Sequence, residues 1–365
     1  MNSHLFFSVF KKKKVLITGD TGFKGSWLSI WLNELGAKVY GYALPPENSN
    51  DNFVITKLGS VINHREGDIR DARKLDAYFQ DVQPHFAFHL AAQSLVLKSY
   101  DEPAETFSTN VAGTVNFFEA VRKTSSVKVA VNITSDKCYQ NNEEDKAYTE
   151  SDPMGGKDPY SASKGCAELV TAAYYHSFFN SPDSCRIASA RAGNVIGGGD
   201  RAKNRLIPDF FKAIAENKKM PVRNPDAVRP WQHVLEPLSG YLSLCAHLHL
   251  HGNKFCGGWN FGPDDNNHYS VSDIMKEIIK ASGKGDYEQE SKRDKPYEAQ
   301  LLKLDISKAE QILKWKPVLD FKQTALFTAK GYDDETSGSD IYKKRIMQIN
   351  EYVALAKAMK INWAQ

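Results

Sequence analysis

The chain has 365 residues, of which 41% are hydrophobic and 25% are charged, a composition typical of globular proteins of one large or two ordinary domains. The net charge of +3 is too small to indicate a nucleic-acid partner, and no apolar run approaches the roughly 18 residues that a membrane helix needs. The five cysteines show no metal-ligand spacing, so we expect reduced thiols, no bound metal and a cytoplasmic location.

Short apolar runs alternate with helical patterns through the first half of the chain. Residues 14–19, 37–44, 85–92, 127–134 and 185–192 are predicted strands, and helices are predicted over residues 23–35, 107–118 and 160–179. Strands that alternate with helices are typical of a Rossmann-type, doubly wound parallel sheet.

The regular alternation of predicted strands and helices ends at about residue 191. The stretch "GNVIGGGDRAKN" reads as a long functional loop, and helices are expected near residues 206, 234, 272, 307 and 341, with a short strand at "GWNFG". We therefore expect residues 1–190 to form the cofactor-binding domain and residues 191–365 a smaller, mostly helical substrate domain. The chain could cross back between the two lobes.

The stretch "TGDTGFKG" carries the first candidate site. Gly19, Gly22 and Gly25 lie between a predicted strand and a helix, where glycine lets the backbone approach the pyrophosphate of a dinucleotide. A tight turn without a ligand is the alternative. The remaining cofactor candidates of this loop are Thr21, Phe23 and Lys24.

The cofactor is predicted to be NAD rather than NADP. Residues 39–55 contain no Arg or Lys that could hold a 2′-phosphate, although the acid that usually binds the ribose is also missing from the strand tip. Asp68 and Ile69 could flank the adenine or simply end a strand. Ala91, Ala92 and Gln93 could let the cofactor lie close to the sheet, or could be ordinary packing residues.

Tyr160 and Lys164 are four residues apart on one face of a predicted helix. A free tyrosine, with a pKa of about 10, is a poor base at neutral pH, and we expect the nearby ammonium to lower the pKa of this phenol. Ser135, at the end of the preceding strand, supplies the hydroxyl that nicotinamide oxidoreductases of this kind use. An exposed tyrosine on a surface helix is the alternative.

These motifs resemble the extended short-chain dehydrogenase/reductase group, which acts mostly on nucleotide sugars. The stretches "HLAAQSLV", "NITSDKCYQN", "ARAGNVIGGGD" and "RPWQHVLEPLSGYL" narrow the resemblance to the nucleotide-sugar 4,6-dehydratases, and within them to those that act on CDP-glucose. The resemblance covers nearly the whole chain. It implies NAD as cofactor, and a homo-oligomer (dimer or tetramer) formed through helices near residues 104–122 and 160–180.

The resemblance also gives roles to Asp136 and Lys137, which follow Ser135 directly. A dehydratase needs an acid for the departing hydroxyl and a base for the C5 proton, and the resemblance makes Asp136 the acid and Lys137 the base. Those roles require a raised pKa for the carboxyl and a lowered pKa for the amine, whereas an ion pair would shift both in the opposite direction. A surface ion pair is the alternative.

Arg229 and Arg205 are expected substrate contacts, because guanidinium groups suit diphosphates, and the resemblance adds Arg191 and Asn194 as sugar or diphosphate contacts. The alternative for each is a surface charge or a turn residue. Two positions depart from the family pattern, Arg201 where Trp is usual and Tyr297 where His is usual, and both could alter the nucleotide pocket. A 4-epimerase would need Ser135, Tyr160 and Lys164 alone. A regulatory NAD-binding protein would need none of them.

Overall fold

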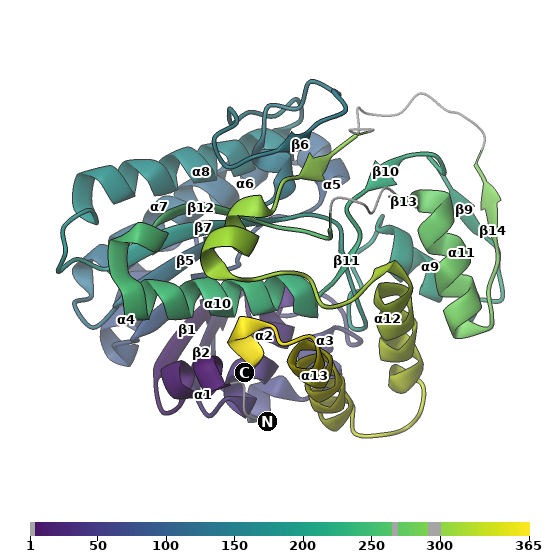
Figure 1. The fold of residues 1–365 in the computed structure, drawn as a ribbon, viewed down its shortest axis with the longest axis horizontal. Coiled ribbons are helices and arrows are strands. Elements are labelled where there is room, and N and C mark those ends of the chain that lie inside the picture. Colours follow the sequence, from purple (N-terminus) through teal and green to yellow (C-terminus); the bar gives the residue numbers. More distant parts are fainter. Residues whose placement is uncertain (1–3, 265–268, 291–300) are drawn as a thin grey trace.

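The computed structural model describes residues 4–264, 269–290 and 301–365. Seven strands form one parallel sheet in the order β12-β7-β5-β4-β1-β2-β3 (Figure 1). Their bounds are β1 (Lys14–Thr18), β2 (Lys38–Ala43), β3 (Asn63–Glu66), β4 (Phe86–His89), β5 (Val129–Ile133), β7 (Arg186–Ala192) and β12 (Gly257–Phe261). The order reverses between β1 and β4, and ligands of such sheets bind at the carboxyl ends of the strands beside this reversal. The predicted Rossmann-type sheet is confirmed.

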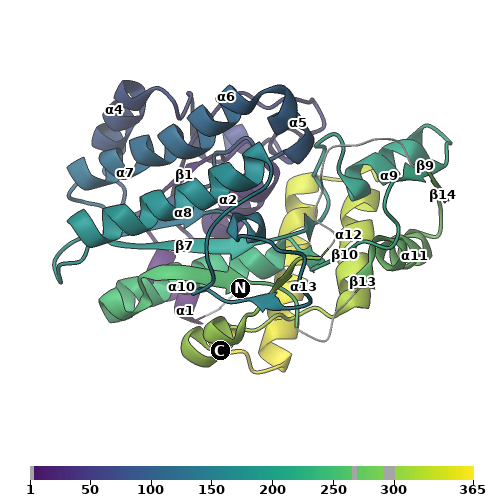
Figure 2. The ribbon, with the colours of Figure 1, turned by 90° about the horizontal axis from the view of Figure 1, so that it is seen from above.

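Helices cover both faces of the sheet (Figures 1 and 2). The helices of this half are α2 (Phe23–Glu34), α3 (Asn52–Ile55), α4 (Ala72–Val82), α5 (Val96–Asp101), α6 (Pro103–Phe107), α7 (Gly113–Lys123), α8 (Pro159–Phe178) and α10 (Leu235–His251). Because successive strand residues face opposite ways, Leu16 packs into the cluster with α4 and α7, whereas Val15 and Ile17 pack into the cluster with α2 and α10. A single wide turn, η2 (Ser108–Ala112), joins α6 to α7.

A second lobe has its own apolar cluster, built around Ile207, Phe210, Ile274 and Tyr332. Its helices are α9 (Leu206–Ala215), α11 (Val271–Ser282) and α12 (Phe321–Glu335). Short strand pairs surround them: β8 (Val195–Ile196) with β11 (Gln232–His233), β9 (Met220–Val222) with β14 (Tyr287–Gln289), and β10 (Val228–Arg229) with β13 (Tyr269–Ser270). Another pair, β6 (Ala147–Tyr148) with β15 (Lys303–Leu304), lies beside the sheet. Between α9 and α11 the chain returns to the sheet through α10 and β12, which pairs with β7.

The two ends of the described chain meet on the outer side of α2 (Figure 1). The helix α1 (His4–Phe10) and the C-terminal elements α13 (Ile341–Ala358) and η6 (Asn362–Ala364) bring Phe6 and Trp363 into a stack with ring centroids 5.0 Å apart. Trp31 of α2 meets both rings edge-on. The C-terminal segment is therefore part of the core of the first half.

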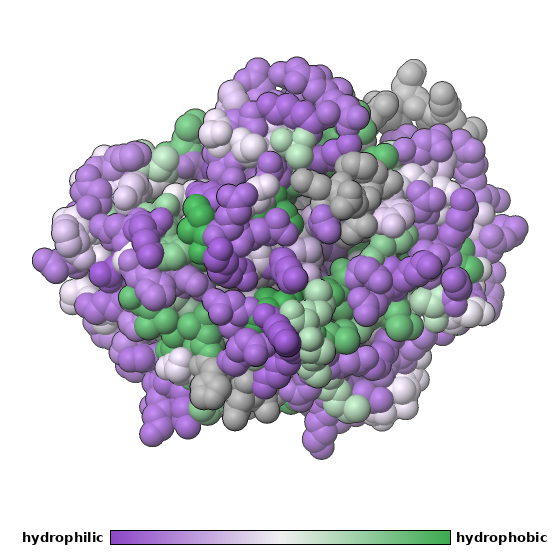
Figure 3. All heavy atoms as spheres, in the orientation of Figure 1, coloured by the Kyte–Doolittle hydropathy of each residue, from purple (hydrophilic) through white to green (hydrophobic). Residues whose placement is uncertain are grey.

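Polar side chains cover most of the face shown in Figure 3, and apolar side chains appear there in small patches. Among the described residues, no helix is long and apolar enough to cross a membrane. The five cysteines form no disulfide.

Candidate active site

The glycine-rich loop connects β1 to α2 and is as tight as the sequence predicts. Gly19 has a φ of +80°, and a Cβ on it would lie 2.6 Å from the backbone nitrogen of Ala91. A Cβ on Gly25 would lie 2.0 Å from the Gly19 carbonyl oxygen, whereas Gly22 is exposed. The loop thus forms a backbone cradle, open at Gly22, at the N-terminus of α2, and this cradle fits the pyrophosphate of a dinucleotide.

The region expected to hold the adenosine half is built from β2 and β3. Asp20 turns back beneath the loop, where its carboxylate meets His64 at 2.7 Å and fills the space beside Gly41. Burial raises the pKa of Asp20 even though the His64 bond opposes it, and that bond raises the pKa of His64 despite its own burial. Asp68, expected near the adenine, is held by Arg70 in a bidentate ion pair, and Ile69 is buried against Gly113.

Gln93, at the end of the segment that carries Ala91 and Ala92, has its amide fully engaged inside the protein. The amide donates to Thr106 and to the carbonyl of Leu95, and its oxygen accepts from the Leu95 nitrogen. Ala91 and Ala92 are half-buried. Gln93 therefore shapes the loop that borders the cradle.

The end of β5 delivers Ser135, Asp136 and Lys137 into a short turn, η3 (Asp136–Cys138). The Ser135 hydroxyl donates to Asp136 Oδ1 at 2.9 Å and accepts from the Lys137 backbone nitrogen at 3.3 Å. Asp136 is 1% exposed, and its Oδ2 has no hydrogen-bond partner among the described residues. That oxygen lies against Gly193, where a Cβ would approach it to 1.8 Å.

Asp136 and Lys137 do not form the surface ion pair that was the alternative. Within residues 4–264, 269–290 and 301–365, no ion pair joins them and the half-buried Lys137 side chain has no salt-bridge partner. The acid and the amine are thus held separately at the carboxyl edge of the sheet.

Tyr160 and Lys164 lie in the first turns of α8, which Asp158 caps by accepting from the Ser161 nitrogen at 2.9 Å. Burial raises the pKa of Tyr160 to about 12, and a hydrogen bond from Ser135 opposes this rise. Burial also lowers the pKa of Lys164 to about 8. In the protein without ligands, the loss of solvation outweighs the lowering effects of Ser135 and Arg205 on the pKa of Tyr160. The expected lowering of this pKa by Lys164, with the cofactor bound, stays a prediction.

Lys24 reaches from the glycine-rich loop into the same group of side chains. Its Nζ lies 3.5 Å from the hydroxyl of Tyr241, a buried residue of α10. Burial lowers the pKa of Lys24 to about 7, with Lys164 and Arg205 acting in the same direction and Asp136 against them. Tyr241 is a residue of this site that sequence reasoning missed, because no local spacing links α10 to the loop.

The four expected substrate residues occupy different places. Arg205 pairs with Asp200 at 3.0 Å and donates to Ser94 at 2.9 Å, so it spans from the second lobe to the loop after β4. Asn194 follows β7 with a φ of +45°. Arg229 lies in β10 and is 6% exposed.

Arg191 faces the protein interior. Its guanidinium pairs with Glu168 at 2.8 Å and donates to the Tyr139 hydroxyl at 2.7 Å. Glu168 also accepts from Ser189 at 2.6 Å and from Thr134, the residue before Ser135. Through Glu168, Arg191 thus stabilises the end of β5, which carries Ser135, Asp136 and Lys137.

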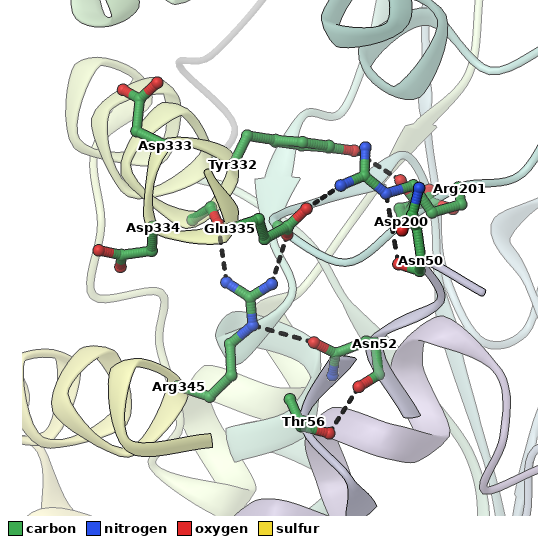
Figure 4. A network of polar contacts seen from close by, with 12 residues as sticks. Asn50, Asn52, Thr56, Asp200, Arg201, Tyr332, Asp333, Asp334, Glu335 and Arg345 are labelled. Carbon is green, nitrogen blue, oxygen red and sulfur yellow. Dashed lines mark hydrogen bonds and ion pairs between the residues drawn. The ribbon is translucent and has the colours of Figure 1, made fainter. Parts of the chain in front are cut away.

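Arg201, which departs from the family pattern, belongs to the polar network of Figure 4. It pairs with Glu335 at the end of α12, and Glu335 also pairs with Arg345 of α13 at 2.5 Å. Arg345 donates to Asn52 at 2.9 Å, and the Tyr332 hydroxyl donates to the carbonyl of Asp200 at 2.8 Å. The network joins the loop of Asp200 and Arg205 to α3, α12 and α13. Tyr297, the other departure, lies outside the described residues.

In the part of the chain that the structure describes, no cluster of His, Cys, Asp or Glu could hold a metal ion. The site combines a dinucleotide cradle with hydroxyl, acid and amine groups at the edge of a Rossmann sheet.

The sequence pattern of the GDP-mannose 4,6 dehydratase family matches residues 16–326. The chain belongs to this family. The CDP-glucose 4,6-dehydratase of Salmonella typhimurium is 46% identical over 94% of this chain and 96% of that protein. The dTDP-glucose 4,6-dehydratase 1 of Escherichia coli is 24% identical over 92% of this chain and 97% of that protein.

Solved structures of related enzymes share the fold of this dehydratase-family chain. The dTDP-glucose 4,6-dehydratase of Bacillus anthracis, in complex with NAD, has a TM-score of 0.74 and 22% identity, covering 90% of this chain and 99% of its own. The UDP-glucose-4-epimerase of Stenotrophomonas maltophila, with bound NAD, has a TM-score of 0.77 and 21% identity, covering 90% of this chain and 100% of its own. At these identities the likeness concerns the fold alone.

Proposed function

We propose that the protein is an NAD-dependent CDP-glucose 4,6-dehydratase, a hydro-lyase that converts CDP-glucose into CDP-4-keto-6-deoxyglucose and water. The observation that carries the proposal is the placement of Asp136 and Lys137 beside Ser135 and Tyr160, with Asp136 buried and not ion-paired with its neighbour. The 46% identity to the Salmonella enzyme supports CDP-glucose as the substrate.

NAD fits the cradle because the glycines leave backbone space at the start of α2. The bound cofactor supplies the hydride chemistry, first as acceptor and then as donor. Its pyrophosphate would lie against Gly19, Thr21, Gly22, Phe23, Lys24 and Gly25, and its nicotinamide half against Ala91, Ala92, Tyr160 and Lys164. Asp68, Ile69 and Gln93 would border it.

The catalytic side chains divide the work between two stages. Tyr160, with Ser135 beside it and Lys164 one turn away, accepts the proton of the C4 hydroxyl as that carbon is oxidised. The resulting ketone acidifies the C5 hydrogen, which Lys137 removes, while Asp136 protonates the departing C6 hydroxyl. Lys137 then returns its proton to C5.

Arg205 is the best placed diphosphate ligand, because it bridges the two lobes over the carboxyl edge of the sheet. Arg229 and Asn194 complete the proposed substrate set. We give Arg191 the supporting role described above.

A 4-epimerase is the second candidate, and epimerases share this fold. Ser135, Tyr160 and Lys164 would suffice for that reaction. The buried Asp136 favours the dehydratase, because an epimerase has no leaving hydroxyl to protonate.

The proposal is tested by incubating the purified protein with CDP-, dTDP-, UDP- and GDP-glucose and following sugar products by mass spectrometry. With CDP-glucose we expect loss of one water and no net consumption of NAD, and Tyr160→Phe should abolish the product. A product of unchanged mass with inverted C4 configuration would instead establish the epimerase.

We further propose a cytoplasmic homo-oligomer in which residues 1–190 bind NAD and residues 191–365 mainly bind the sugar nucleotide. Two apolar side chains support self-association, Leu169 of α8 with 60% exposure and Phe107 of α6 with 38% exposure.

A further inference from the structure

Gln232 of β11 joins the ends of two strands of the main sheet. Its Nε2 donates to the carbonyl of Gly193 at 3.0 Å, directly after β7, and to the carbonyl of Phe261 at 3.1 Å, at the end of β12. Its backbone nitrogen donates to the carbonyl of Asn194 at 3.3 Å. Gln232 therefore holds two successive carbonyls, those of Gly193 and Asn194.

The amide of Gln232 can take only this orientation. Both hydrogens of Nε2 go to carbonyl oxygens, which accept hydrogen bonds but cannot donate them. The other end of the amide, Oε1, is buried and has no hydrogen-bond partner among the described residues. The residue as a whole is 1% exposed. Because turning the amide around would place its oxygen against two other oxygens, Gln232 serves this place through its two donors.

The Gly193 that Gln232 holds is also the residue against which Asp136 lies. β7 neighbours β5 in the sheet, and Asp136 Oδ2 fills the space beside Gly193, 1.8 Å from where a Cβ would be. In the described part of the chain that oxygen accepts no hydrogen bond, whereas Oδ1 accepts from Ser135. The direction of Oδ2 is therefore set by its contact with Gly193.

We infer that Gln232 is a positioning residue for the loss of water, which acts through Gly193 on Asp136. The inference rests on the proposed function. In that step Lys137 takes the C5 proton, the C5–C6 double bond forms, the C6–O bond breaks, and Asp136 gives its proton to the departing oxygen. Such a transfer needs the acid within hydrogen-bond distance of that oxygen.

Removal of the Gln232 amide should affect one stage of the reaction and spare the other. The carbonyls of Gly193 and Phe261 lose this donor, so the segment that follows β7 is free to shift. The acid of the elimination then loses the contact that fixes its Oδ2. Oxidation at C4 depends instead on Tyr160 and Lys164 of α8, so hydride transfer to NAD should continue.

The test compares Gln232→Met with wild type in rapid mixing with CDP-glucose, where reduction of bound NAD reports the oxidation at C4 and its reoxidation reports the later steps. Methionine keeps the length of the side chain and removes both donors. Water loss should slow roughly ten-fold or more while NAD reduction keeps its wild-type rate, so that reduced NAD accumulates. Equal slowing of both stages, or water loss at the wild-type rate, would overturn the inference. A wild-type protein that reduces no NAD would instead overturn the proposed function.

Gln348→Met is the matched control. Gln348 of α13 is also 1% exposed, its Nε2 donates to the carbonyl of Phe327 at 2.6 Å, and its Oε1 has no partner among the described residues. This variant should not accumulate reduced NAD, whereas Gln232→Glu, which keeps the shape of Gln232 and loses a donor, should do so. Accumulation in Gln348→Met would make slow water loss a general result of losing a buried amide and would overturn the inference.

A fluorinated substrate separates the positioning of the acid from a general loss of activity. In CDP-6-deoxy-6-fluoroglucose the group that leaves C6 is fluoride, which departs as a stable anion and depends less on proton transfer than hydroxide does. The elimination defects of Gln232→Met and Asp136→Asn should both shrink with this substrate. With CDP-glucose, the double variant should be no slower than Asp136→Asn alone. Defects of the same size on both substrates, or defects that multiply in the double variant, would overturn an action through Asp136.

Discussion

Gly193 determines where the carboxyl group of Asp136 can lie. It directly follows β7, and the space that a side chain would take is filled by Asp136 Oδ2, 1.8 Å from the position of a Cβ. The acid of the proposed reaction is thus positioned from two neighbouring strands, with Ser135 holding one oxygen and Gly193 making room for the other.

We predict that Gly193→Ala lowers kcat at least ten-fold, which corresponds to roughly 1.4 kcal/mol in the activation barrier. The added methyl must displace the carboxyl from the site. Gly262→Ala is the matched control, because its Cβ would meet its nearest atom at an ordinary 3.6 Å. Steady-state kinetics with CDP-glucose measures both variants, and a wild-type kcat in Gly193→Ala would contradict this account of Asp136.

At the scale of elements, α10 and α13 are joined through a buried carboxyl group. Glu236 accepts from the backbone nitrogens of Val318 and Leu319 and from the Tyr352 hydroxyl at 2.7 Å. Burial raises its pKa to about 7, although these donors oppose the rise. The segment leading into α12 therefore depends on a group that titrates near neutral pH.

The folded protein binds a proton at Glu236 that the unfolded chain releases above its ordinary pKa of 4.5. Stability from this group is complete below that value, is lost as the pH rises toward about 7, and is constant above it. We predict that the melting temperature of wild type falls more steeply between pH 5 and pH 7 (roughly the window set by the linkage relation) than that of Glu236→Gln. Parallel curves in differential scanning calorimetry would contradict the assignment.

The ion-pair network around Glu335 also joins α12 to α13. Arg345 is 0% exposed, and removing one partner of a buried ion pair typically costs about 3–5 kcal/mol. We predict that Arg345→Met destabilises the protein by about 3 kcal/mol in urea unfolding. Lys343→Met, a change at an exposed residue of the same helix, should have little effect. An unchanged unfolding midpoint in Arg345→Met would mean that the network does not hold the lobes together.

Local sequence patterns were enough to predict the strands β1, β2, β4, β5 and β7 and the helix α8, because each is a short buried run or a clear amphipathic pattern. The same holds for the spacing of Ser135, Asp136 and Lys137 at a strand end. The helices α1, α4 and α12 were not predicted. In α12 the buried face includes Thr324, Thr328 and Gly331, so its apolar periodicity is weak. Tyr241, Gly193 and Asp200 enter the site from distant elements, which no local spacing records.

For the whole molecule, the proposed self-association depends on apolar side chains that are exposed on the surface of the single chain. Leu169 of α8 is 60% exposed and lies on one of the two helical segments through which we propose that the chain self-associates. We predict that Leu169→Glu converts the proposed oligomer into a monomer in light scattering coupled to size exclusion. Leu250→Glu, at a 50% exposed leucine of α10, is the control and should leave the assembly intact. A wild-type protein that is monomeric at all concentrations would contradict the proposal.

The stack of Phe6 on Trp363, closed by Trp31, has a consequence for biosynthesis. During translation, the residues of the proposed NAD-binding half leave the ribosome before Trp363 is synthesised. Trp363 completes the aromatic cluster of that half. Until then, the apolar face of α2 around Trp31 is exposed in the newly synthesised chain, where chaperones could recognise it. A truncation that removes Trp363 would therefore leave every proposed catalytic residue in place and still expose the apolar face of α2 that Trp31 presents.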